Sequence, residues 1–309
     1  SFEITSETAK FLVGRLFSFE LLPFSFYEFL NAKDRGLAKI FLEKNGLIRN
    51  LIMRGEDFEI PSSDVFVPDL LEHFEEYVLF GGYPEVVKAE REEEKRIIIK
   101  NIFNTYLEKD IVSYLQISDT IKFRRLVTIL SSLIGDMIKF ESLCNQTGSY
   151  FKEIIHLIDI LEQTYVIRLI RPFSRSLVTE LRKNPKVYFL DSGLRNYPIN
   201  NFNPLERRSD AGSLAENFVL NELNQIGENH LINFWRTTAK AEVDFILCNQ
   251  QEIPIEVKFE EFKKEKISRS LHSFIDTYSP KFALVITKRS WGEMICKNTK
   301  VIFVPIVYL

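Results

Sequence analysis

Two carboxylates and a lysine in the last third of the chain are spaced like a site that could bind a metal ion and activate a water molecule. Asp244 lies in an apolar run at 241–247, and the next apolar run, at 252–258, carries Glu256 and Lys258. Residues two apart in a strand share a face, so Glu256 and Lys258 point the same way. If the two runs form a hairpin, Asp244 lies beside Glu256, and two such carboxylates repel each other unless a cation lies between them.

A Mg²⁺ or Mn²⁺ ion would supply that cation, because both metals accept oxygen ligands. Glu216, on a helical run upstream, is the candidate third carboxylate. We therefore predict Glu216, Asp244 and Glu256 as metal ligands. We also predict Asp244, Glu256 and Lys258 as catalytic residues, with Lys258 holding or deprotonating a water at the metal. The alternative is a salt bridge on a sheet, with no reaction. Glu242 is expected on the opposite strand face, exposed to solvent.

These residues need a compact α/β unit to position them. The pattern predicts a helix at 212–226, strands at 231–236, 241–247 and 252–258, a helix at 266–278, and strands at 281–287 and 300–305. A stretch at 201–210, with Pro204 and the pair Arg207 and Arg208, is typical of a linker before this unit. The predicted order places Glu216 on the first helix and the other candidates on the second and third strands.

The middle of the chain predicts a winged helix-turn-helix at 119–200. Three helical patterns are followed by two β-like runs, at 165–171 and 186–190. The outward residues of the third helix are more acidic than basic, which opposes DNA binding through that helix. DNA contact would then involve the wing and the sheet, with these candidates: Arg171, Arg175, Arg182, Lys183 and Arg236. A purely architectural winged helix is the alternative.

Residues 1–118 are predicted to be helical. Apolar residues recur at steps of three and four, Pro68 opens one helix, and Gly81 and Gly82 end it. The longest helical stretch, at 90–116, is either one helix or two with a break. The predicted units are therefore 1–118, 119–200 and 205–309, in a multidomain α and α/β protein.

Composition excludes several classes of protein. Of the 309 residues, 45% are hydrophobic and 27% charged, as in soluble globular proteins and unlike disordered chains. The three cysteines are widely spaced, which argues against a disulfide framework and a zinc cluster. No apolar run reaches the roughly 20 residues of a membrane helix. The residues from Ser1 on show no basic region followed by an apolar core, so no signal peptide is expected. These features predict a cytoplasmic protein without a membrane partner.

The carboxylates and lysine resemble a known superfamily of nucleases. Glu216 on a helix, Asp244 on a strand and Glu256 and Lys258 on the next strand are similar to the PD-(D/E)XK nucleases, which share a restriction-endonuclease-like αβββαβ core. The resemblance implies that the aspartate and glutamates bind Mg²⁺ while the lysine positions or activates water. Val243 stands where that motif has a proline.

A second resemblance covers nearly the whole chain. Five segments are similar to signatures of archaeal and bacterial AAA-type P-loop ATPases that carry a C-terminal domain of unknown function of the DUF4143 type: 12–15, 20–30, 79–85, 105–111 and 187–194. The resemblance implies the order ATPase, winged helix, nuclease-like domain. The chain has twelve glycines but no G-x-x-x-x-G-K-[ST] loop to hold nucleotide phosphates. Residues 1–118 are therefore expected to be a helical lid remnant that follows an absent ATPase core, and ATP binding is expected in the intact protein alone.

Together these patterns predict Mg²⁺-dependent hydrolysis of DNA, regulated or driven by ATP turnover in the intact protein. The alternative is a non-catalytic nuclease-like fold that serves as a DNA-binding, protein-binding or assembly module, with a protein partner or a second copy of the chain.

Overall fold

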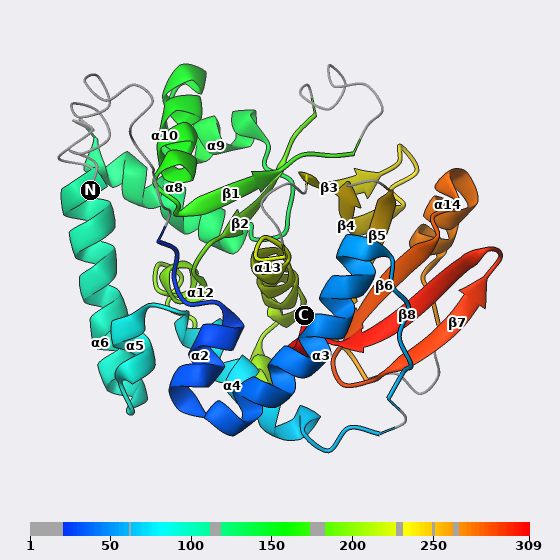
Figure 1. Cartoon of the computed structure of the whole chain (residues 1–309). Coiled ribbons are helices and arrows are strands. Elements are labelled where there is room, and N and C mark those ends of the chain that lie inside the picture. Colours follow the sequence, from blue (N-terminus) through cyan, green and yellow to red (C-terminus); the bar gives the residue numbers. More distant parts are fainter. Residues whose placement is uncertain are drawn as a thin grey trace, which may run out of the picture.

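The fold combines helices with one large mixed sheet, in a computed structural model that describes residues 21–61, 63–111, 119–173, 183–226, 231–248, 251–261 and 266–309 (Figure 1). The ATPase-like segment at 12–15 lies outside the described residues, whereas the segment at 20–30 is described from Leu21 on.

The first part of the described chain is helical, as predicted, and α4 begins and ends close to the predicted Pro68 and Gly81. Ser25 caps α2 in a reciprocal capping box with Glu28, and Gly55 ends α3 in the left-handed conformation. Pro68 stands in the first turn of α4, and Gly81 ends it. The predicted stretch at 90–116 is helical from Glu92 and changes from α to π geometry at Phe103. The elements are α2 (Phe26–Lys33), α3 (Arg35–Arg54), α4 (Val67–Phe80), α5 (Pro84–Lys88), α6 (Glu92–Ile102) and the π-helix Phe103–Ile111.

Three helices and a two-stranded ribbon follow, in the predicted order. The ribbon is antiparallel and pairs Ile167 with Phe189 and Ile170 with Lys186. The order of elements is therefore confirmed, while the winged-helix assignment stays a prediction. The elements are α8 (Thr120–Ser132), α9 (Phe140–Thr147), α10 (Phe151–Gln163), β1 (Ile167–Ile170), β2 (Lys186–Phe189) and α12 (Ser192–Asn196).

The C-terminal third forms a six-stranded mixed sheet in the order β3-β4-β5-β6-β8-β7 (Figure 1). Strands β3, β4 and β5 are antiparallel neighbours, and β5, β6 and β8 are parallel. The predicted helices and strands are all present, and β7 is an additional strand that the sequence pattern did not indicate. The elements are α13 (Ala211–Leu223), β3 (Leu231–Arg236), β4 (Glu242–Cys248), β5 (Glu252–Lys258), α14 (Arg269–Tyr278), β6 (Phe282–Thr287), β7 (Gly292–Cys296) and β8 (Thr299–Pro305). The restriction-endonuclease-like assignment stays a prediction.

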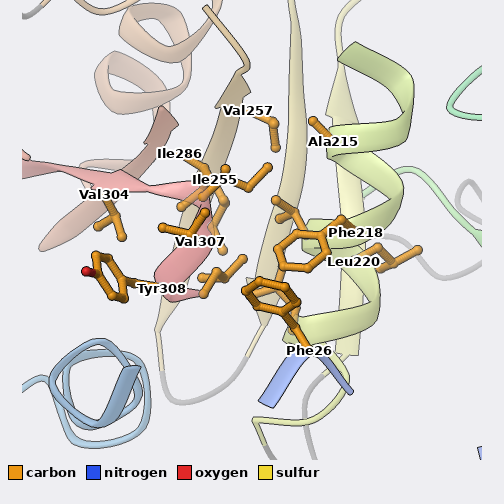
Figure 2. Packing of buried hydrophobic residues seen from close by; sticks show 14 of the residues in the cluster. Phe26, Ala215, Phe218, Leu220, Ile255, Val257, Ile286, Val304, Val307 and Tyr308 are labelled. Atoms are coloured by element: carbon orange, nitrogen blue, oxygen red, sulfur yellow. The ribbon is translucent and has the colours of Figure 1, made fainter. Parts of the chain in front are cut away.

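One hydrophobic core joins the first helices to this sheet. Phe26 of α2 contacts Phe218 of α13 edge to face, with ring centroids 5.3 Å apart. Figure 2 shows these rings facing the sheet residues Ile255 and Val304 across the core. A second core holds α6 together with α8, α9, α10 and the ribbon, and a third lies between the sheet and α14. Helices α2–α4 therefore share a core with the C-terminal sheet.

The stretch at 201–210 is not an exposed linker, which corrects the sequence-based interpretation. Phe202, Leu205 and Arg208 are buried. Arg208 and the buried Arg195 both form ion pairs with Asp210, at 2.8 and 2.5 Å. The pair of Asp210 with Arg195 connects this stretch to α12, and Arg208 is an internal ion-pair partner, whereas Pro204 and Arg207 are exposed.

The end of the chain is fastened to α3. Asn45 donates hydrogen bonds from its side chain to the backbone carbonyls of Tyr308, at 3.2 Å, and Leu309. The buried carboxylate of Asp64 pairs with Lys44 and accepts hydrogen bonds from Trp291 and Tyr308, at 3.0 and 2.9 Å. These contacts hold the first and last parts of the described chain together.

None of the helices within the described ranges has the length and apolar character to cross a membrane.

Candidate functional site

Strands β4 and β5 separate at the position of Asp244. Their ladder pairs Cys248 with Glu252 and extends to Phe245 and Ile255. Beyond that pair, β5 continues to Lys258 along β6. The carboxylate of Asp244 accepts a hydrogen bond from the backbone N–H of Val257, with Oδ2 2.7 Å from the nitrogen. The predicted hairpin is therefore confirmed, and the side chain of Asp244 lies against the end of β5.

Glu256 has one paired and one unpaired carboxylate oxygen. Oε1 lies 2.9 Å from Nζ of Lys258, which confirms that the two side chains share a face. Oε2 is buried and has no hydrogen-bond partner within the described part of the chain. The residue as a whole is 3% exposed, whereas the Lys258 side chain is 37% exposed. Lys258 is therefore the solvent-accessible side of the pair.

Glu216 joins the site from α13. Burial, followed by repulsion from Asp244, raises the pKa of Glu216 to about 8, and burial also raises the pKa of Asp244. The hydroxyl of Tyr188 donates to Oε2 of Glu216 at 3.1 Å. The repulsion between the two carboxylates shows that Glu216 lies near Asp244. The hydrogen bond from Tyr188 connects Glu216 to the ribbon β1–β2.

Lys186 is a residue of the site that the sequence reasoning missed. Its Nζ lies 2.6 Å from Oε1 of Glu242 and 3.8 Å from Oε2 of Glu216, and its side chain is 4% exposed. Burial acts to lower the pKa of Lys186, but attraction by Glu216, Asp244 and Glu242 outweighs it, so the pKa is raised. Lys186 opens a strand in which all four residues are buried. A buried lysine needs a carboxylate partner, but the burial of Lys186 follows from how the ribbon packs and has no signal in the sequence.

Glu242 is not exposed on the opposite face, so the expectation for this residue was wrong: it is two residues from Asp244 in β4, and regular strand alternation puts both side chains on the same face. It is half-buried and bridges Lys186 and Arg236, with the Arg236 pair at 2.8 Å. In β3, Arg236 pairs directly with Glu242 across the ladder, and the register shift between Asn233 and Trp235 falls further along β4, between Val243 and Ile246. Glu242 therefore belongs to the charged cluster.

The cluster carries an excess of negative charge. Among the side chains that the structure describes, the carboxylates here are Glu216, Glu242, Asp244 and Glu256, and the cationic groups paired with them are Lys186, Arg236 and Lys258. With every group ionised, the acidic groups outnumber the basic ones by one. Such a cluster favours either a bound proton or an additional cation.

The carboxylates are not arranged as a complete metal cage. In the described ranges, no three His, Cys, Asp or Glu side chains are placed to hold one metal ion together. Mg²⁺, however, is commonly bound by one or two carboxylates, with waters and substrate phosphates as its other ligands. Asp244 and the unpaired Oε2 of Glu256 fit that smaller donor set. Glu216 would have to leave Lys186 and Tyr188 to join them.

Lys258 is protonated at neutral pH. Burial alone would lower its pKa, but attraction by Glu256, Asp244 and Glu216 raises it above the ordinary value. A protonated lysine donates hydrogen bonds and accepts no proton. Its chemistry here is to orient a water or a phosphate oxygen.

The predicted DNA contacts are only partly described. Lys183 is exposed, and Arg236 is paired with Glu242. Arg171 lies next to the sheet, where its carbonyl accepts a hydrogen bond from the backbone of Phe234 at 3.1 Å. Arg175 and Arg182 lie outside the described residues. Of these candidates, Arg236 lies in the charged cluster. Whether the five residues form one DNA-binding surface stays a prediction.

Two family models match separate parts of the chain. Residues 71–205 match "Domain of unknown function (DUF8612)", and residues 211–307 match "Domain of unknown function (DUF4143)". The C-terminal region is a DUF4143 domain. It contains Glu216, Glu242, Asp244, Glu256 and Lys258. Lys186 and Tyr188 lie in the DUF8612 match, so the charged cluster spans the boundary between the two families.

Similar proteins in other organisms have no assigned function. The chain is 25% identical over 272 residues to Uncharacterized protein MJ1544 of Methanocaldococcus jannaschii, which covers 85% of this chain and 55% of that protein. It is 24% identical over 307 residues to an uncharacterized protein of Haemophilus influenzae, covering 97% and 67%. Uncharacterized protein Rv2008c of Mycobacterium tuberculosis is 26% identical over 211 residues, covering 67% and 47%. The chain thus spans about half to two thirds of these relatives. No solved structure matches it significantly.

Proposed function

We propose that the DUF4143 domain of this chain is a Mg²⁺-dependent nuclease that hydrolyses phosphodiester bonds in DNA. The observation that carries the proposal is Oε2 of Glu256, a buried carboxylate oxygen without a hydrogen-bond partner in the described residues. Unsatisfied buried oxygens are rare and costly, and they mark places where an ion or water binds. Asp244 lies beside it where β4 and β5 separate.

The side chains divide the work as follows. Asp244 and Glu256 would hold the metal, which when bound stabilises negative charge on the phosphate and lowers the pKa of a bound water. Lys258, held by Glu256 at 2.9 Å and open to solvent, orients the attacking water and the phosphate oxygen. The water oxygen forms a bond to phosphorus, the bond from phosphorus to the leaving oxygen breaks, and the water proton leaves with solvent or the leaving group.

The role of ATP is a proposal about the whole protein. The chain spans 55% of the M. jannaschii relative, and its segments at 79–85, 105–111 and 187–194 resemble AAA-type ATPase signatures. We infer that ATP binding and turnover belong to an ATPase core outside this chain. Helices α2–α4 would transmit its state to the nuclease domain, because they share a core with α13 and the sheet.

Plasmid cleavage tests the nuclease proposal. The chain is incubated with supercoiled DNA and Mg²⁺ or Mn²⁺, together with Asp244→Asn and Lys258→Met. Glu252→Gln is the matched control, because it removes a carboxylate from the same strand at the far end of the hairpin. We expect nicking by the wild type and the control, and roughly a hundredfold loss in the two site variants. Equal cleavage by wild type and site variants would rule the proposal out.

A non-catalytic binding or assembly module is the second candidate. It is favoured by the ion pairs of Lys186 with Glu242 and Glu216, which satisfy much of the cluster without a metal. In that case the chain binds DNA, a protein partner or a second copy but leaves plasmid intact with either metal. DNA binding at low salt without metal-dependent cleavage would support this candidate.

A further inference from the structure

Lys186 reaches the acidic cluster from a different part of the chain. It lies on the ribbon β1–β2, in the DUF8612 match, whereas Glu216 and Glu242 lie in the DUF4143 domain. The ribbon is held beside the edge strand β3 by two backbone hydrogen bonds, from Phe173 to Phe234 at 2.5 Å and from Phe234 to Arg171 at 3.1 Å. Figure 1 shows the ribbon lying next to β3.

The ammonium of Lys186 faces the protein interior. Its side chain is 4% exposed and contacts the carboxylates of Glu216 and Glu242 and the ring of Phe234, whose centroid is 5.4 Å away. A group buried in this way does not reach a substrate phosphate in solution. Its chemistry is that of a counter-ion, a fixed positive charge among carboxylates.

The surroundings of Glu216 come from the same upstream part. Tyr188, two residues after Lys186, donates a hydrogen bond to Oε2 of Glu216. Gly135, in the loop after α8, adopts a positive φ of +78°, and a Cβ at this position would lie 3.3 Å from the same oxygen. The ribbon and this loop therefore both contact the carboxylate of Glu216, which also lies near enough to Asp244 for the two carboxylates to repel each other.

We propose that Lys186 competes with the divalent metal for Glu216 and thereby sets the metal affinity of the site. This inference rests on the proposed nuclease function. A carboxylate paired with an ammonium binds a second cation less well, because the two cations repel each other and share the same oxygens. With the ribbon seated, the site has two carboxylate ligands, Asp244 and Glu256. With the ribbon withdrawn, Glu216 becomes the third. Metal binding by Glu216 and the contact of the β1–β2 ribbon with Glu216 are therefore mutually exclusive.

The first test measures Mn²⁺ binding by titration calorimetry on the whole chain. Lys186→Met keeps the length of the side chain and removes its charge. Lys152→Met, an exposed lysine on α10, is the control. We expect Lys186→Met to bind Mn²⁺ about tenfold more tightly or better, and the control to match the wild type. Unchanged or weaker binding by folded Lys186→Met overturns the inference.

The second test uses the wild type alone. It is needed because Lys186→Met leaves buried carboxylates without a partner and can fail to fold. Amide hydrogen exchange of β1 and β2 is followed in wild-type protein as Mn²⁺ is added. We expect faster exchange in the ribbon as the metal withdraws Glu216 from Lys186. Unchanged or slower exchange at saturating Mn²⁺ overturns the inference.

The two proposals fail in different ways. Metal binding and plasmid cleavage by the wild type, without an affinity change in Lys186→Met, leave the nuclease function standing and remove the role of Lys186. No metal binding by any form of the chain removes both.

Discussion

The buried oxygen of Glu256 has a cost as well as a use. An unpaired buried acceptor costs roughly 1–3 kcal/mol of folding free energy. The same strand could carry an apolar residue in this position, as it does at Ile255 and Val257, which are both buried. Lys258 pairs with Oε1 of this carboxylate, but the unpaired Oε2 weakens the fold unless a further cation or a donor reaches it. This is the pattern expected where a residue serves binding at the expense of stability.

A second buried carboxylate, Glu222 on α13, makes a pH-dependent prediction. Burial raises its pKa to about 7, although the backbone N–H of Phe26 donates to it at 3.0 Å. The unfolded chain loses this proton near pH 4.5, and the folded chain keeps it until about pH 7. The folded state therefore binds more protons between these values, and stability falls as pH rises through that window, by roughly 3 kcal/mol.

Glu222→Gln removes this dependence, because glutamine keeps an oxygen for the N–H of Phe26 and carries no charge. The measurement is urea unfolding at pH 5 and pH 7.5. We expect the variant to lose less stability than the wild type between these two values. Glu206→Gln, at an exposed position, is the control. A fall in the Glu222→Gln variant as large as in the wild type would show that Glu222 is not the group responsible.

The sequence identified some residues of the site and missed others for a physical reason. Asp244, Glu256 and Lys258 were predictable because the period of a strand and a short hairpin bring them together. Lys186 and Glu242 were not, since their pairing depends on how the ribbon packs on the sheet. A β-strand pattern specifies which side a residue faces but not which distant element covers that side.

Glycines at the ends of elements determine how closely helices approach. A Cβ on Gly193, in α12, would lie 2.2 Å from the carbonyl oxygen of Phe80, at the end of α4. Backbone atoms cannot move aside as a flexible side chain does. Gly46, inside α3, has no atom within 4 Å of an added Cβ among the described residues. The two positions therefore form a matched pair.

Alanine at these two positions should act in opposite directions. Gly193→Ala forces α12 away from α4 and should lower the free energy of unfolding by at least about 2 kcal/mol. Gly46→Ala should raise it by up to about 1 kcal/mol, because alanine favours a helix interior. Thermal unfolding of both variants measures this. Equal stability of Gly193→Ala and wild type would mean that the approach of α12 to α4 is looser than described.

The elements that the sequence predicted best are those with strong local signals. Helix α2 has a capping box, α3 ends at a glycine, and α4 has a proline in its first turn and a glycine after its last residue. The strands that carry Asp244 and Glu256 are mostly apolar. Strand β7 was missed because Glu293 and Ile295 are exposed and its strand conformation comes from pairing with β8. The change to π geometry at Phe103 has no local residue signal in the sequence.

At the scale of the molecule, the first helices and the last strands depend on each other. Phe26 is fully buried against Phe218 and Tyr77, and Phe74 also contacts Phe218, with centroids 4.8 Å apart. This side of α13 is covered by α2 and α4. A piece consisting of residues 205–309 would expose these apolar surfaces, although the sequence pattern predicts it as a separate unit.

Phe26→Ala tests this dependence. Removing a buried ring costs roughly 3–5 kcal/mol, and we expect the loss to appear as faster amide exchange in α13 and β5, which are distant from Phe26 in the sequence. Phe151→Ala, at an exposed ring on α10, should leave exchange in those elements unchanged. Faster exchange confined to α2 and α3 would show that the C-terminal sheet is stable without them.

The contact between α3 and the end of the chain has a consequence for synthesis on the ribosome. Asn45 emerges 263 residues before its acceptor Tyr308. At ordinary rates of translation, this delay is on the order of 10–50 s. Throughout that time the apolar faces of α2, α3 and α4 lack the sheet that covers them. We therefore expect nascent chains of this protein to be clients of a chaperone, and to complete their largest core only when β8 has left the exit tunnel.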